Sequence, residues 1–145
     1  MDRCALAYEL HRKKNNCAQS VVGAFSDLTG LSLEQCMGIA AGFGGGVGGS
    51  HEELCGAVSG GVLTLGLLFP EDKRRCYALS KEFRRRFQEA FGRTGCRELL
   101  AARPGTSERT PAAKRLNAAT HCNIMVVTAV ELLEELLRDE ENRPD

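Results

Sequence analysis

Cysteines are the residues of this 145-residue sequence with the most capacity for chemistry, and there are seven of them. Four share one placement, in or just before the first turn of a helix that the sequence predicts: Cys17, Cys55, Cys96 and Cys122. A helix start presents unpaired backbone N–H groups and about half a positive charge, which favours thiolate and lowers a cysteine pKa from about 8.5. This placement indicates reactive or metal-liganding sulfur, although cysteine is also a common buried core residue.

The other three cysteines have less distinctive positions. Cys76 falls on the same apolar helix stripe as Leu79 and Phe83, and Cys36 lies inside another apolar helix segment. For these two we expect a packing role. Cys4 is close to the N-terminus, where we expect an exposed side chain without a function.

Two histidines flank the selected thiols. His51 precedes Cys55 by four residues, and His121 directly precedes Cys122. Either histidine is able to serve as a metal ligand or an acid–base partner, but a histidine at a helix start is also commonly a cap or a surface group. The sequence leaves their roles open.

A glycine-rich tract over residues 42–49 formally matches the dinucleotide fingerprint G-x-G-x-x-G. That fingerprint requires a preceding strand, whereas a helix is predicted here, and no Gly-Lys-Ser/Thr follows to make a phosphate-binding P-loop. The tract is therefore either a tightly turned connector or a loop whose N–H groups approach the sulfurs of a cofactor or a small anion. On the second interpretation Phe43 shields the site from water, and the candidate cofactor-binding residues are Phe43, Gly44, Gly45, Gly46 and Gly56.

Several familiar sites are absent from the sequence. It contains no C-x-x-C, no C-x-x-C-H for covalent haem and no H-E-x-x-H. Four well-separated cysteines are a poor match to structural zinc, whose ligands usually come in close pairs, but they are compatible with an iron–sulfur cluster on a folded scaffold. We therefore expect an iron–sulfur cluster as the cofactor and no covalent haem.

Charge and hydropathy exclude further classes of partner. Lys and Arg equal Asp and Glu at 19 each, so no basic excess points to nucleic acid or an anionic membrane. The most apolar run, 55–69, is shorter than the roughly 20 residues of a membrane span and predicts a buried helix. Residues 1–14 carry charges on both sides of a short apolar stretch, so we expect a cytoplasmic protein, where the reducing environment opposes a static disulfide framework.

Apolar spacing of three and four residues recurs along nearly the whole chain and predicts an all-α fold. We expect residues 1–145 to form a single-domain helical bundle of about six to seven helices with a glycine-rich loop. The predicted helices cover about residues 2–13, 17–28, 32–42, 55–69, 71–91, a short segment near 96–100, and 122–140. Asn16 and the Ser32–Gln35 capping box mark two of the starts. Residues 103–111 are predicted to be a mobile loop, and the last four residues to fray.

Five stretches carry a resemblance to a known family. They are residues 16–21 (Asn-Cys-Ala-Gln-Ser-Val), 42–48, 55–60 (Cys-Gly-Ala-Val-Ser-Gly), 91–100, and His121–Cys122 before an amphipathic helix. In this order they span most of the chain and resemble the C-GCAxxG-C-C family of redox-active proteins. The family's four characteristic cysteines then fall on the four that helix placement selected. One departure is that Asn15 and Asn16 stand where the family has glycines.

The resemblance implies a redox use of the thiols. Similar domains occur in split-Soret cytochromes beside an iron–sulfur centre and haem, so our leading hypothesis is electron transfer or redox sensing through a cluster on Cys17, Cys55, Cys96 and Cys122. The alternative is thiol–disulfide chemistry without a cluster, in which Cys55 attacks and a neighbour such as Cys17 resolves. A third hypothesis is a non-redox zinc-binding or interaction module.

Cluster ligation and disulfide exchange both require proximity, so we expect at least three of the four sulfurs within about 7 Å of a common point, beside the 42–49 tract. A redox function also implies a redox partner protein, whose identity the sequence does not give, and the chain is compatible with a homodimer.

Overall fold

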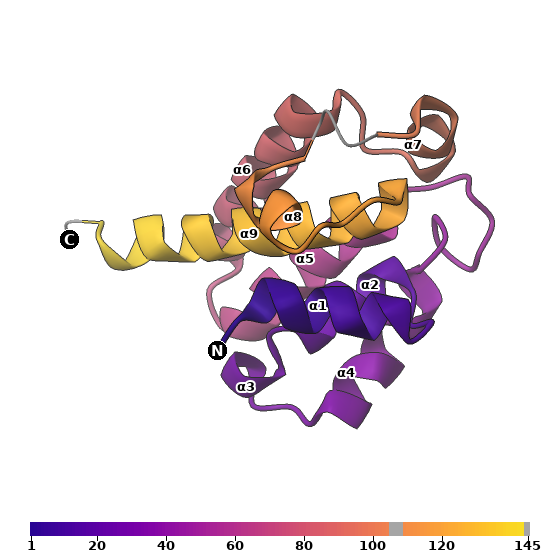
Figure 1. The fold of residues 1–145 in the computed structure, drawn as a ribbon. Coiled ribbons are helices and arrows are strands. Elements are labelled where there is room, and N and C mark those ends of the chain that lie inside the picture. Colours follow the sequence, from indigo (N-terminus) through magenta and orange to yellow (C-terminus); the bar gives the residue numbers. More distant parts are fainter. Residues whose placement is uncertain (105–108, 144–145) are drawn as a thin grey trace.

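Helices account for the regular structure of the part of the chain that the computed structural model describes, residues 1–104 and 109–143. Over these ranges there are nine α-helices, one 3-10 helix and no strand (Figure 1). In chain order they are α1 (Arg3–Arg12), α2 (Cys17–Gly23), α3 (Ser26–Thr29), α4 (Leu33–Ala40), η1 (Ala41–Phe43), α5 (Gly56–Leu68), α6 (Lys73–Phe91), α7 (Cys96–Ala102), α8 (Pro111–Arg115) and α9 (His121–Glu141). The predicted all-α, single-domain class is confirmed.

Helix starts follow the capping signals in the sequence. The Asn16 side chain accepts a hydrogen bond from the backbone N–H of Gln19, and the Gln19 side chain accepts one from Asn16, which closes a capping box. Ser32 and Gln35 form a second capping box at the start of α4, as predicted. Each box satisfies backbone donors that the first turn of a helix leaves open.

Two boundaries differ from the prediction. The helix expected over residues 17–28 ends at Gly23, because Phe25 N–H bonds to Val22 O three residues back and the chain turns to bury Phe25 completely. The short α8 was not predicted, although Pro111 at the first helical position is a recognised start signal. Residues 105–108 of the predicted mobile loop, and residues 144–145 of the end predicted to fray, lie outside the described residues.

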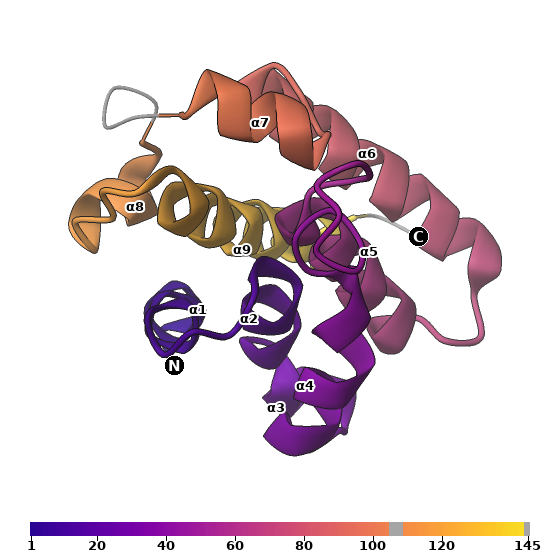
Figure 2. The same ribbon diagram turned by 90° about the vertical axis from the view of Figure 1, so that its right-hand side faces the viewer.

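Helix α9 occupies the middle of the bundle. Figure 2 shows it with α1 and α2 on one side and with α6 on the other. Its inward residues Val126, Val130 and Leu133 are fully buried, and they share one core with Phe83 and Phe87 of α6. Neighbouring helices therefore hold α9 on both sides.

Helix α5 is packed closely on both sides. A Cβ on Gly60 would lie 3.0 Å from the backbone of Ala18 in α2, and one on Gly61 would collide with the ring of Phe83 in α6. The absence of these side chains lets α5 fit between α2 and α6. Among the described residues, none of the helices combines the length and the apolar character that a membrane crossing needs.

The three cysteines without a predicted chemical role lie in or against the core. Cys36 is fully buried, and Cys76 is half-buried against the main core, in keeping with packing roles. Cys4 was expected to be exposed, and that expectation is wrong, because its side chain is 3% exposed. It lies under α9, where its Sγ is 3.5 Å from a carboxylate oxygen of Glu134, and burial raises its pKa above the usual range.

Candidate functional site

The four selected thiols all stand at helix starts, as the sequence predicted. Cys17 and Cys96 are the first residues of α2 and α7, Cys55 caps α5, and Cys122 is the second residue of α9. The remaining question is which of these helix starts lie together.

The starts of α5 and α7 are joined by backbone hydrogen bonds. Cys55 N–H donates to Thr94 O at 2.8 Å, and Cys96 N–H donates to Glu53 O at 3.0 Å. These bonds surround an isolated antiparallel bridge between Leu54 and Gly95. Cys55 and Cys96, which are 41 residues apart in the sequence, are therefore held in adjacent segments.

The start of α2 packs directly on the start of α5. A Cβ on Gly56 would lie 3.0 Å from Cys17 Cβ and 3.1 Å from Ala18 N, so a larger residue would separate the two helices. Gly56, a candidate cofactor-binding residue in the sequence, here provides room for the α2 start.

The glycine tract packs against the same region. Gly46 has a φ of +69°, and a Cβ there would lie 2.7 Å from Cys96 Cβ and 2.9 Å from His51 Cα. Gly44 is buried against the side chain of Asn16. The loop over residues 42–51 closes on itself through four backbone hydrogen bonds: Gly48 N–H to Gly42 O, Gly49 N–H to Gly44 O, Ser50 N–H to Val47 O, and His51 N–H to Gly45 O. The tract therefore acts as a tight structural loop beside the thiols.

Phe43 does not shield the site. It ends the 3-10 helix η1 on the outer surface, and its side chain is 38% exposed. The sequence could not show this, because the direction of Phe43 depends on the single turn that joins α4 to the glycine tract.

Two histidines contact thiols of the site. His51 Nδ1 lies 3.3 Å from Cys96 Sγ, and the φ of His51 is +62°, a conformation that is costly for a residue other than glycine. His11 Nε2 lies 3.6 Å from Cys17 Sγ. Sequence reasoning missed His11, because a turn separates it from Cys17 and only the position at the end of α1 brings them together.

His121 makes no such contact. Its Nε2 atom is buried and has no hydrogen-bond partner among the described residues. Burial lowers the pKa of His121, and the positive charges of Arg103 and His11 lower it further. A neutral imidazole therefore lies at the start of α9.

The thiols of Cys17 and Cys122 interact between the starts of α2 and α9. The hydrogen bond from Cys17 lowers the pKa of Cys122 to about 7, against the opposing effect of burial. The same hydrogen bond raises the pKa of Cys17 well above 9.0, and burial and the charges of the other three thiols raise it further. Near neutral pH Cys122 is therefore the thiol of the pair that ionises, while Cys17 keeps its proton.

The other two thiols are protonated at neutral pH. Burial raises the pKa of Cys55 to about 11, although the backbone N–H groups of Ala57 and Val58 act in the opposite direction. Burial also raises the pKa of Cys96, followed by the charge of Cys122, while Arg97 opposes the rise. The expectation that helix placement lowers every one of the four pKa values is wrong for three thiols, because burial outweighs the helix start.

The Cys122 thiol acts on the pKa values of the other three thiols, so the four lie in one region of the molecule. All seven cysteines are free. Yet within residues 1–104 and 109–143 no three or more His, Cys, Asp or Glu side chains are grouped so that they could hold a metal ion. Four thiols are suitable soft donors, but this arrangement of them does not fit a metal centre.

Comparison with known proteins gives a family. The family model described as "Putative redox-active protein (C_GCAxxG_C_C)" matches residues 15–136, most of the chain. The chain belongs to this family. Within the C_GCAxxG_C_C match lie all four thiols and the glycine tract, whereas Cys4 and His11 precede it. Neither the curated proteins nor the solved structures provide a match.

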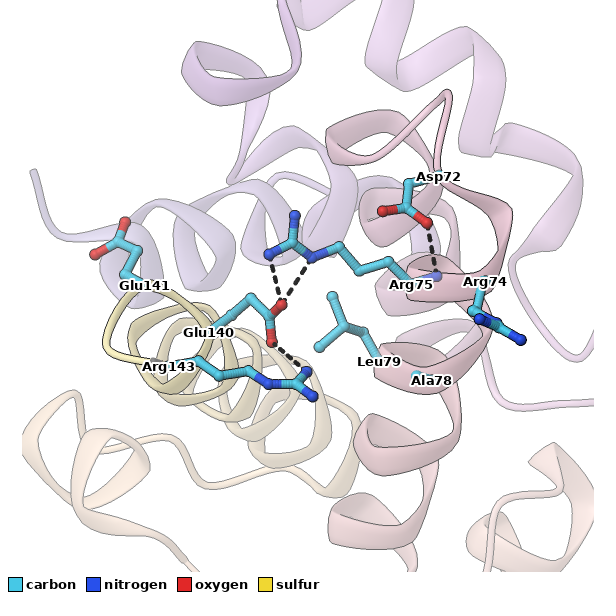
Figure 3. A pocket seen from close by; sticks show the side chains of 8 residues that line it. All are labelled: Asp72, Arg74, Arg75, Ala78, Leu79, Glu140, Glu141 and Arg143. Carbon is cyan, nitrogen blue, oxygen red and sulfur yellow. Dashed lines mark hydrogen bonds and ion pairs between the residues drawn. The ribbon is translucent and has the colours of Figure 1, made fainter. Parts of the chain in front are cut away.

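A charged cleft lies far from the thiols. Figure 3 shows it between the start of α6 and the end of α9, where Glu140 points between Arg75 and Arg143. Glu140 follows Cys122 by 18 residues on α9, which is about 27 Å of helix. The cleft is therefore separate from the thiol site.

Proposed function

We propose that this redox-active protein works by thiol–disulfide exchange, with Cys122 as the attacking thiolate and Cys17 as the resolving thiol. The observation that supports the proposal is their shared hydrogen bond, which gives Cys122 a pKa of about 7. A thiol whose pKa is near the ambient pH combines a large thiolate fraction with good nucleophilicity. Cys17, which interacts with Cys122, would then resolve the intermediate.

The exchange has two steps. Cys122 thiolate attacks one sulfur of a partner's disulfide, forming a mixed disulfide and releasing the partner's first sulfur as a thiolate. Cys17 then loses its proton and attacks the Cys122 sulfur, releasing the second partner thiolate. The partner's disulfide gains two electrons and becomes two thiols, while Cys17 and Cys122 lose two electrons and become a disulfide.

The attacking thiol in this proposal is Cys122, whereas the sequence analysis assigned that role to Cys55. Cys55 is 3% exposed and has a pKa of about 11, so it is protonated at neutral pH and poorly accessible to a partner. Cys17, which the sequence also named for thiol chemistry, keeps its role as the resolving thiol.

An iron–sulfur cluster on Cys17, Cys55, Cys96 and Cys122 is the second candidate. Its support is the meeting of four thiols at four helix starts, which would offset the negative charge of a cluster. The thiols would have to move before they could act as ligands, because no metal-holding group exists among the described residues. No reaction step is derived through a cluster.

The choice between thiol–disulfide exchange and a cluster is tested by anaerobic purification, followed by metal analysis, an absorption spectrum and thiol counting. We expect a colourless protein without stoichiometric iron or zinc, and two more titratable thiols after dithiothreitol treatment of the oxidised protein. Cys122→Ser and Cys17→Ser should each abolish this difference, whereas Cys76→Ser, at a packing position, should preserve it. A brown protein containing iron and sulfide would select the cluster, and stoichiometric zinc would select the non-redox module.

A further inference from the structure

His11 is held between two side chains of the thiol region. It lies in the last turn of α1, and its ring contacts both α9 and α2. On one side Nδ1 makes a short hydrogen bond with Asn123 Oδ1. On the other side Nε2 lies 3.6 Å from Cys17 Sγ. The imidazole therefore bridges an amide and the thiol that resolves the mixed disulfide.

The contact with Asn123 decides which nitrogen carries the proton. An amide oxygen is only an acceptor, so Nδ1 of His11 must be the donor. In the neutral imidazole the other nitrogen, Nε2, then has a free lone pair directed toward Cys17. His11 is in this way oriented as a proton acceptor for the Cys17 thiol.

The resolving step requires such an acceptor. The Cys17 thiol is half-buried, and the interaction with Cys122 followed by burial raises its pKa well above 9.0. When Cys122 enters a mixed disulfide it loses its negative charge, but burial still favours the protonated form of Cys17. Since thiolate is the attacking species, Cys17 must pass its proton to a group within reach.

We propose that His11 is the general base that takes the proton from Cys17 in the resolving step, and that Asn123 holds the imidazole in position for this transfer. The proposal rests on the proposed exchange between Cys122 and Cys17. The Cys17 S–H proton moves to His11 Nε2, and the sulfur electron pair forms the bond to Cys122 Sγ. The bond between Cys122 and the partner sulfur breaks, and the departing thiolate takes that electron pair and then a proton.

The surroundings of His11 agree with this role. The ionisable groups that bear on it are Cys17 from α2 and His121 from α9. Burial, followed by the charges of Arg103 and His11, lowers the pKa of His121 and favours its uncharged form. His11 also precedes residues 15–136, the range that the family model matches.

His51 provides a matched control. It makes the same kind of contact, with its Nδ1 at 3.3 Å from Cys96 Sγ, but it has no place in the exchange between Cys122 and Cys17. The same substitution at His51 removes an imidazole from the thiol region without removing the proposed base.

The experiment follows the reaction of 5,5′-dithiobis(2-nitrobenzoate) with the full chain in a Cys76→Ser, Cys96→Ser background. The first equivalent of thionitrobenzoate reports attack by Cys122, and the second reports resolution by Cys17. We expect His11→Gln to slow the second phase at least about tenfold, within the range of general-base effects, and to leave the first within about twofold. Asn123→Ala should slow the second phase less, and His51→Gln should change neither.

The outcomes separate this proposal from the proposed function. Both the exchange and the role of His11 are overturned if the Cys76→Ser, Cys96→Ser chain releases only one equivalent of thionitrobenzoate from Cys17 and Cys122. The same holds if Cys122→Ser keeps the first phase of release. If it releases two equivalents and the second phase is equally fast in His11→Gln, the role of His11 alone is overturned. Asn123→Ala keeps the test decisive should His11→Gln fail to fold, because an unchanged second phase in that variant also contradicts an oriented base.

Discussion

Two opposing effects act on each cysteine at a helix start in this protein. The backbone N–H groups of the first turn favour thiolate, whereas burial favours thiol. At Cys55 burial has the larger effect and the pKa is about 11, although the N–H groups of Ala57 and Val58 oppose the rise. At Cys122 the hydrogen bond from Cys17 decides the balance, and the pKa is about 7. The attacking thiol is therefore selected by its neighbour rather than by its helix.

The pH dependence of Cys122 reactivity follows from this hydrogen bond. We predict that alkylation of Cys122 by iodoacetamide, located by mass spectrometry, rises as the pH passes through about 7 and then levels off. Cys17→Ala should move the midpoint upward, because the donor is lost, while Cys17→Ser should move it less, because the hydroxyl still donates. A midpoint near 9 in the unmodified chain would contradict the pairing.

The same pKa has a consequence for stability. The folded-state pKa of Cys122 is lower than the ordinary 9.0, so its ionisation contributes to folding fully above pH 9. This contribution should be lost as the pH falls through about 7. Urea unfolding at a series of pH values, with Cys122→Ser as the control that lacks the titration, measures it.

At the scale of elements, the glycine tract sets the distance between the thiol-bearing segments. Four of its glycines have positive φ, which other residues adopt only at a cost: Gly45, Gly46, Gly48 and Gly49. They differ in surroundings, since Gly46 lies against Cys96 and His51 whereas Gly48 faces open space. The tract thus offers a pair of sites with similar backbone strain and different packing.

Gly46→Ala and Gly48→Ala should therefore differ in their effects. Both place alanine at positive φ, at a cost of roughly 1–2 kcal/mol. Only at Gly46 would the added Cβ also push against Cys96 and His51. We therefore predict that Gly46→Ala loses more unfolding free energy than Gly48→Ala, and that Cys96 is alkylated faster in it. Urea unfolding and peptide-resolved alkylation measure the two effects. Equal behaviour of the two variants would show that the tract does not position Cys96.

Some elements were predictable and others were not, for local reasons. The helix starts at Asn16 and Ser32 are predictable from the sequence, because each side chain hydrogen-bonds to the first turn of its own helix. The end of α2 depends on the burial of Phe25 in a core assembled from distant segments, which no local pattern shows. The start of α8 at Pro111 carried a local signal that the loop-like composition before it obscured.

At the scale of the whole molecule, α9 connects the thiol site to the charged cleft at its other end. Near that end Glu140 accepts two bonds from Arg75, at 2.7 Å and 2.6 Å, and its side chain is only 12% exposed (Figure 3). This ion pair ties the end of α9 to the start of α6. It should help to fix the direction of α9 and, with it, the place of Cys122.

Glu140→Gln tests how much this ion pair contributes to the free energy of unfolding. We predict a loss of about 0.5–1 kcal/mol in unfolding free energy, because the pair is partly shielded from water on the Glu140 side. Glu141→Gln, a neighbouring change on the rim of the same cleft, should cost less. Urea unfolding at low and high salt provides the measurement, and the difference should shrink in salt. Equal losses of unfolding free energy in the two variants would show that this ion pair does not stabilise the fold.

The sequence could predict which thiols matter but not how they pair. Helix placement and the family pattern both select the same four cysteines from their local neighbours in the chain. The partnership of Cys17 with Cys122, and the contact of His11 with Cys17, arise only when α1, α2 and α9 pack side by side (Figure 2). Contacts of this kind depend on the whole core, so the sequence offered no direct sign of them.

The most direct test of the central claim is to identify the disulfide that forms on mild oxidation. The full chain is equilibrated in defined mixtures of oxidised and reduced glutathione, remaining thiols are blocked, and linked peptides are identified by mass spectrometry. We predict one reversible disulfide joining Cys17 to Cys122, lost in either serine variant and restored by reoxidation after reduction. A disulfide joining Cys55 to Cys96 instead, or none over the whole range of mixtures, would contradict the account.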